Sequence, residues 1–158
     1  MTQDYLQIMI ESLEKKNEVL DKVMELDKEQ LTLALKRPVD ISAYDELMDR
    51  KGLLIDELEK LDAGFTSTYE RVKDEVLANP EKYKEQVIIM QDLIRSAVSK
   101  GVSVEVQEQR NKQAMQTMLQ TKRQEIKQLK VSTSAASKYY KAMSRINDVD
   151  PQLMDRKK

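Results

Sequence analysis

The side chains that most often carry out enzyme chemistry are missing from this sequence. It contains no His and no Cys, so it lacks the commonest zinc ligands, the thiol nucleophile and the imidazole that acts as acid or base near neutral pH. Carboxylates are the remaining candidates, and Asp148 and Asp150 form the one close pair in a segment without helical periodicity. Because Asp150 precedes Pro151, an arrangement typical of the start of a helical turn, we interpret the pair as a turn and cap.

Glycine-rich phosphate-binding loops are missing as well. Gly52, Gly64 and Gly101 are the three glycines, and they are too far apart to form a nucleotide-binding motif. We therefore expect a protein that is not an enzyme and that uses no metal or organic cofactor. Gly52 and Gly64 fall inside a predicted helix, where each costs about 1 kcal/mol relative to Ala. Close approach of a neighbouring helix would explain them, and a hinge or a groove for a partner helix is the alternative.

The length of the chain indicates that any functional site is built by a single domain. The chain has 158 residues, which predicts a single hydrophobic core. Its net charge is only -1, but residues 1–109 carry 15 basic and 24 acidic groups, whereas residues 110–158 carry 12 and 4. The lack of cysteine and of a leader sequence predicts a cytoplasmic protein. The longest apolar run, residues 87–90, is too short to span a membrane.

Apolar residues recur at alternating spacings of three and four in segments that Pro38 and Pro80 separate. This pattern predicts helices over residues 3–36, 42–78 and 80–130, with a break near Gly101 left open. The short connection between the first two helices indicates an antiparallel hairpin. We predict an all-α fold, an elongated antiparallel bundle of three to four long helices with coiled-coil packing. Residues 1–130 form the bundle, and residues 131–158 form a short helix and tail.

Polar residues also occupy seam positions and helix ends. Asn17 and Asp27 interrupt the seam of the first helix, where single polar residues commonly fix helix register at a cost in stability. Residues 42–45 have the spacing of a capping box, and Asn79 is expected to cap the third helix. Residues 102–106 alternate like a strand, but no second stretch could pair with them. We therefore interpret residues 102–106 as helix.

The third predicted helix is the longest. It would extend about 75 Å, against about 50 Å for each of the others. Its excess apolar face would lack cover within the chain, and such a face favours binding of a partner helix. We predict that this face comprises Met115, Met118, Leu119, Ile126, Leu129, Tyr139, Tyr140 and Met143, with steering charges from Lys122, Arg123, Lys127 and Lys138. The alternatives are that Met115 and Met118 fill an ordinary seam and that the basic residues form a solvated face.

Several stretches carry a family likeness. They are LALK at 33–36, YDELMDRKGLLIDEL at 44–58, RNK at 110–112, KRQEIK at 122–127, ASKYY at 136–140 and MDRKK at 154–158. Over most of its length the sequence resembles the FlgN family of flagellar export chaperones. The resemblance implies a small cytoplasmic chaperone that binds the terminal helical segment of hook-filament junction (hook-associated) proteins through its C-terminal part. It also implies delivery of these proteins to the flagellar type III export gate.

Three alternatives to this function remain. One is a sister flagellar chaperone for cap or filament subunits, and another is a homodimeric coiled-coil scaffold or adaptor that uses the same face on itself. The third is a helical nucleic-acid-binding protein. The basic C-terminal part lacks clustered arginines and has few aromatic residues for base stacking. We therefore expect no nucleic-acid partner.

Overall fold

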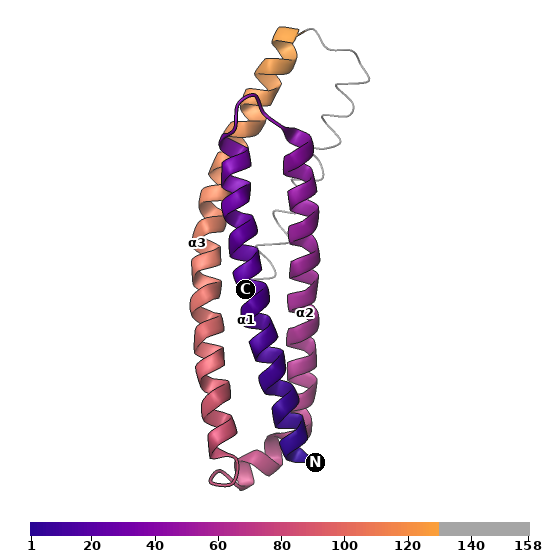
Figure 1. The fold of residues 1–158 in the computed structure, drawn as a ribbon, viewed down its shortest axis with the longest axis vertical. Helices are drawn as coiled ribbons and strands as arrows, with labels where there is room; N and C mark the ends of the chain where they lie inside the picture. Colours follow the sequence, from indigo (N-terminus) through magenta and orange to yellow (C-terminus); the bar gives the residue numbers. More distant parts are fainter. Residues whose placement is uncertain (130–158) are drawn as a thin grey trace. The chain divides into compact units, whose positions relative to one another are not determined.

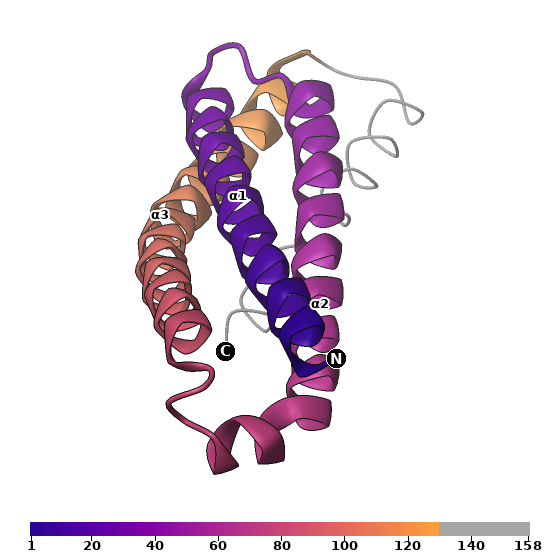
Figure 2. The same cartoon turned by 60° about the horizontal axis from the view of Figure 1, so that its bottom comes forward.

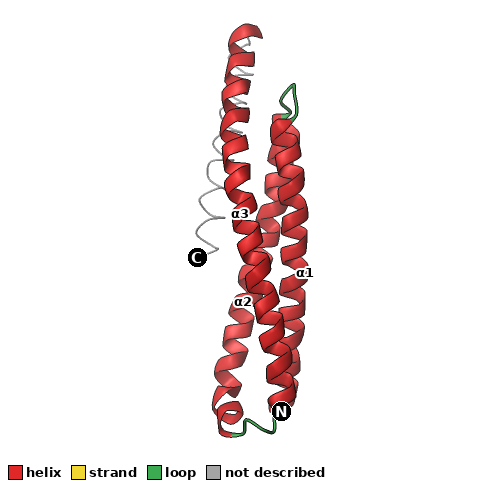
Figure 3. Cartoon of the chain, turned by 90° about the vertical axis from the view of Figure 1, so that its left-hand side faces the viewer, coloured by secondary structure: helices red, strands yellow, loops and turns green. Residues whose placement is uncertain are grey.

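The computed structural model describes residues 1–129, with side chains up to Lys127. This part of the chain folds into three long helices. Helix α1 spans Thr2–Leu35, α2 spans Ile41–Ala78 and α3 spans Lys84–Leu129. Figure 3 shows helices and loops, and no strand, in this part of the chain. The predicted all-α helical bundle is therefore confirmed, and α3 continues through Gly101 without a break.

The chain divides into two compact units. Of the described residues, unit 1 contains 1–22 and 56–103, and unit 2 contains 23–55 and 104–129. Each unit has its own apolar cluster, where the chain length predicted one hydrophobic core. The predicted short helix and tail at 131–158 lie outside the described residues.

Unit 1 contains the beginning of α1 and the end of α2, which are antiparallel (Figure 2). The Asn17 amide donates to the carbonyl oxygen of Leu93 at 3.2 Å, and Lys100 Nζ lies 3.2 Å from a carboxylate oxygen of Asp21. These contacts advance together along both helices, so α3 runs parallel to α1 in this unit. The apolar cluster of unit 1 consists of Leu6, Met9, Ile10, Leu13, Val72, Tyr83 and Met90.

The connection between α2 and α3, also in unit 1, differs from the prediction. Helix α3 begins at Lys84 rather than at residue 80, because residues 80–83 form turns. The Asn79 side chain donates backwards to the Glu75 carbonyl oxygen at 2.9 Å. It therefore terminates α2 and does not cap α3. Buried Tyr83 holds the turn by donating its hydroxyl to Glu75 Oε1 at 3.2 Å.

Unit 2 contains the connection between α1 and α2 (Figure 1). Arg37 donates to the Ala34 carbonyl oxygen at 2.8 Å and so satisfies one of the last acceptors of α1. Asp40 Oδ1 accepts from the backbone N–H of Ala43 at 3.0 Å, which makes Asp40 the N-cap of α2. The predicted capping box at residues 42–45 is therefore wrong, because the N-cap lies two residues before Ser42 and Ser42 itself is inside α2.

Close helix packing does not explain the glycines of α2. A β-carbon placed on Gly52 or Gly64 would have no described heavy atom of a neighbouring element within 4 Å. The expectation that these residues allow a neighbouring helix to approach is therefore wrong. Gly64 instead lines an open groove in unit 1.

Candidate functional site

Three of the residues predicted to form an uncovered face are buried. Met115 and Met118 are 5% and 0% exposed, and Leu119 is 7% exposed. They belong to the apolar cluster of unit 2, whose other buried members are Ala34, Val39, Tyr44, Leu47, Met48 and Ile55. The prediction that these three side chains are free to receive a partner is wrong, and the alternative of ordinary seam filling is correct for both methionines.

The packing within unit 2 explains this error. Met115, Met118 and Leu119 share one apolar cluster with Ala34 at the end of α1 and Val39 in the α1–α2 connection. The spacing of apolar residues along α3 does not show which of its positions these elements cover.

An overhang of α3 nevertheless exists. The helix continues ten residues beyond Leu119, the last buried residue among those with described side chains, and ends at Leu129. This segment projects past the α1–α2 connection (Figures 1 and 3). We call residues 120–129 the α3 tip. It adds about 15 Å of helix to unit 2.

The α3 tip carries the predicted residues that remain outside the core. Ile126 is half-buried, whereas Arg123 and Lys127 are exposed. Lys122 forms an ion pair with Glu125 at 3.6 Å, which compensates part of its charge. Leu129 belongs to the helix, but its side chain and residues Lys138, Tyr139, Tyr140 and Met143 lie outside the description of the structure.

The most unusual chemistry in the described chain is a buried polar cluster in unit 2. Lys51 of α2 is 0% exposed, and its ammonium group contacts three oxygen atoms. These are Asp27 Oδ1 of α1 at 2.6 Å, Glu108 Oε1 of α3 at 2.5 Å and Gln30 Oε1 of α1 at 2.7 Å. One lysine side chain therefore connects all three helices of the unit.

Further buried amides and a hydroxyl extend this cluster. Gln30 donates its amide to the Tyr44 hydroxyl at 2.8 Å, and Asn111 donates to the Asp27 carbonyl oxygen at 2.9 Å. Gln107 in turn donates to Asn111 Oδ1 at 3.0 Å. Because a buried polar group is costly unless it is paired, these bonds compensate for the desolvation of the side chains around Lys51.

Asp27 is held in an environment that favours its protonated form. The pKa of Asp27 is raised from 3.8 to about 7, mainly by burial and next by the neighbouring Glu108 carboxyl, whose effect on the pKa exceeds the opposing effect of nearby Lys51. Lys51 Nζ lies close to Oδ1, but no N–H or O–H of the described residues makes a well-aligned hydrogen bond to either oxygen. A proton shared with Glu108 would satisfy this pair of carboxyls.

This cluster is suited to specifying structure rather than to catalysis. Asp27 and Lys51 are closed to solvent, so a substrate could not reach them. Among residues 1–129, no group of three or more His, Cys, Asp or Glu side chains is arranged to hold a metal ion. A buried polar group at a seam position fixes how neighbouring helices align, and the Lys51 contacts do so for three helices together.

No protein-family model, curated protein or solved structure matches this chain. The fold and the side-chain geometry are therefore the observations on which a function can be proposed. In the described part of the chain, no helix is both long and apolar enough to cross a membrane.

The cluster could have been found in the sequence. Asp27 interrupts the predicted seam of the first helix, and Lys51 falls in the three-four spacing of the second, Leu47, Lys51, Leu54 and Leu58. Glu108 and Asn111 follow when the spacing of the third helix is continued from Ala97. The signal is the occurrence of opposite charges at the core-facing positions of three different helices, which becomes clear only when the three helices are compared together.

Proposed function

We propose that this protein is a cytoplasmic flagellar type III export chaperone that binds the terminal helical segment of a hook-associated protein and delivers it to the export gate. The observation that supports the proposal best is the α3 tip. It is a helical extension of unit 2 that has neither α1 nor α2 beside it (Figures 1 and 3).

The proposed contact surface is smaller than the one predicted from the sequence. Buried Met115, Met118 and Leu119 are no longer part of it. The surface begins at the α3 tip with Ile126 and Leu129 and continues into Tyr139, Tyr140 and Met143. An amphipathic helix can bind to such apolar positions at helical spacing.

Charge supports the same location. Residues 110–158 carry 12 basic and 4 acidic groups, and Arg123 and Lys127 are exposed on the tip. Positive charge at the rim of a binding surface accelerates association with an acidic partner and makes the rate sensitive to salt. The tip would therefore attract an acidic or amphipathic helix before apolar contacts form.

Deletion of the C-terminal segment tests the proposal. A chain that ends at Lys130 retains both apolar clusters, so we expect an unchanged helical circular dichroism spectrum. Binding to a purified hook-associated protein, measured by isothermal titration calorimetry, should weaken at least tenfold. Unchanged affinity of a folded truncated chain would remove Tyr139, Tyr140 and Met143 from the surface.

Charge reversal provides a matched pair of variants. Arg123→Glu should slow association and alter its salt dependence, whereas Arg110→Glu, which changes an exposed arginine before the tip, should not. Equal effects of the two variants would contradict a binding surface on the tip. Light scattering distinguishes the export chaperone from the homodimeric scaffold. If the wild type is a dimer and the truncated chain is a monomer, the surface binds a second copy of this chain.

A further inference from the structure

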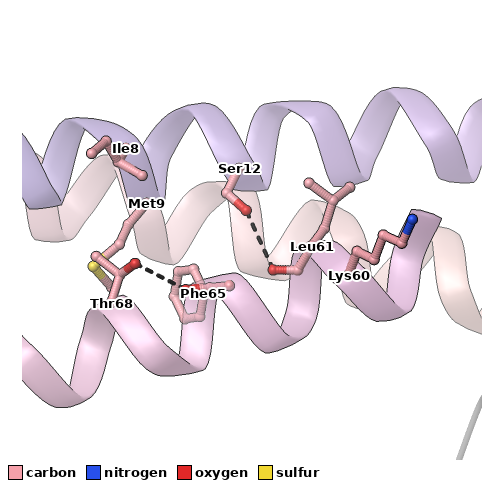
Figure 4. A pocket seen from close by; sticks show the side chains of 8 residues that line it. Ile8, Met9, Ser12, Lys60, Leu61, Phe65 and Thr68 are labelled. Atoms are coloured by element: carbon pink, nitrogen blue, oxygen red, sulfur yellow. Dashed lines mark hydrogen bonds between the residues drawn. The ribbon is translucent and has the colours of Figure 1, made fainter. Parts of the chain in front are cut away.

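A second surface lies in unit 1, away from the α3 tip in sequence. It is a groove of about 170 Å³ between α1 and α2. Figure 4 shows Ile8, Met9 and Ser12 on α1 facing residues of α2. The groove is lined by Ile8, Met9, Ser12, Lys60, Leu61, Gly64, Phe65 and Thr68. We call it the Gly64 groove.

The Gly64 groove is open because a side chain is missing from one wall. Gly64 has no β-carbon, and a β-carbon placed there would meet no described heavy atom of another element within 4 Å. Across from it, Ile8 remains 51% exposed although it is a large apolar residue. Apolar surface is therefore left in water at a place where the helix backbone is bare.

The size of the groove limits what it can bind. Its volume of about 170 Å³ is below the roughly 300–1,000 Å³ of typical small-molecule sites. It is comparable to one large apolar side chain. Such a pocket between two helices is suited to an anchor residue of a helix that lies along the groove.

The charges along α2 indicate the chemistry of that helix. Lys60 and Arg71 precede and follow Gly64 by four and seven residues, so both lie on the same face of α2 as Gly64. Both are exposed, and neither has a carboxylate partner within the described residues; Arg71 stands over the Tyr5 ring at 5.9 Å. The two acidic residues between them, Asp62 and Glu70, pair with Lys16 and Lys73 at 2.7 Å each, and residues 63–69 carry no charge.

We propose that the Gly64 groove binds an acidic amphipathic helix of a partner protein. The helix inserts one large apolar side chain over Gly64, between Ile8 and Phe65, and places carboxylates against Lys60 and Arg71. The inference is independent of the export function, because it uses only residues of unit 1 and does not involve the α3 tip.

A synthetic helical peptide tests this proposal on the full-length protein. The probe is an alanine-based helix with a central leucine and glutamates four and seven residues to either side, so that either direction along α2 is matched. With isotope-labelled protein, titration should shift the amide NMR signals of Ile8, Gly64 and Phe65. A peptide with glutamine in place of each glutamate should bind at least tenfold more weakly.

Two glycine variants separate binding from folding. Gly64→Leu fills the groove with the protein's own side chain and should abolish the peptide-induced shifts. Its melting temperature should not fall, because leucine favours the helix over glycine and the site has space. Gly52→Leu is the matched control, since Gly52 lies in the same helix with equal space but outside the groove, and it should bind the peptide as the wild type does.

Three results would overturn the proposal. One is the absence of shifts at the groove residues at millimolar peptide, and another is unchanged binding by Gly64→Leu. The third is self-association of the wild type that Gly64→Leu removes, because the groove would then bind a second copy of this chain. A double variant, Lys60→Glu with Arg71→Glu, should reverse the charge preference and favour a lysine version of the peptide.

Discussion

Replacing Asp27 by asparagine should make the protein more stable above neutral pH, although Asp27 is fully buried and ion-paired. In the folded protein the pKa of Asp27 is raised from 3.8 to about 7. The folded state therefore binds the proton more tightly than the unfolded chain between these values. The contribution of Asp27 to the free energy of unfolding therefore falls as the pH rises from about 4 to about 7, and this loss is complete above about 7.

The magnitude follows from the same pKa difference. It corresponds to about 4 kcal/mol when the pH exceeds both values. The side chain introduced by D27N would have nearly the same shape as the carboxylate and no charge to desolvate, and its amide could donate to Glu108 while its oxygen faces Lys51. We therefore expect D27N to exceed the wild type in unfolding free energy by up to about 4 kcal/mol near pH 8. Near pH 4 this advantage should disappear.

Urea unfolding, followed by circular dichroism from about pH 4 to pH 8, measures this difference. Other carboxyls also titrate in this range, so the comparison between variants is the decisive quantity. Asp21→Asn is the matched control, because Asp21 also lies on α1 but forms an exposed pair with Lys100. The reasoning fails if D27N and the wild type lose stability in parallel as the pH rises, or if D21N reproduces the effect of D27N.

Three further changes test the polar contacts of the bundle. Lys51→Met leaves the Asp27 and Glu108 carboxyls buried without their ammonium partner and should cost about 3–5 kcal/mol near pH 8; urea titration should show a smaller loss near pH 5, where Asp27 takes up a proton. Tyr44→Phe removes the hydroxyl that accepts from the Gln30 amide and should cost about 1–3 kcal/mol in the same assay. Asn17→Leu should raise the free energy of unfolding by about 1 kcal/mol, and with it the melting temperature, because Asn17 Oδ1 is buried without a partner among the described residues. A lower melting temperature would contradict this.

The helices could be predicted from the sequence because their signals are local. The three-four periodicity and the prolines placed α1 and α2 within one or two residues of their observed ends. The start of α3 was wrong because Asn79 bonds backwards to Glu75 rather than forwards, and both directions are chemically reasonable for asparagine. Local pattern alone does not decide between them.

The candidate site was harder to predict because burial depends on which helices meet. Met115 and Met118 have the same spacing whether they face a partner or the core, and the residues of α1 and α2 that pack against them in unit 2 decide between the two. Lys51 shows the same difficulty, since a charged residue at a seam position is interpretable only when its partners on other helices are known. Pairing Lys51 with Asp27 and Glu108 requires contacts between residues up to 57 positions apart.

The Lys51 cluster also restricts how the chain length can vary between related proteins. A one-residue insertion in a helix turns everything beyond it by about 100°, so an insertion in α2 before Lys51 would move the ammonium group out of the interior. Related sequences should therefore keep an acidic residue followed three positions later by Gln, a lysine 21 positions after that Gln, and a Glu 57 positions after the lysine. Asn follows this Glu by three positions. This spacing could identify distant relatives whose remaining residues have diverged. Insertions should be tolerated mainly where a deletion nearby restores the number of residues between two members of the cluster.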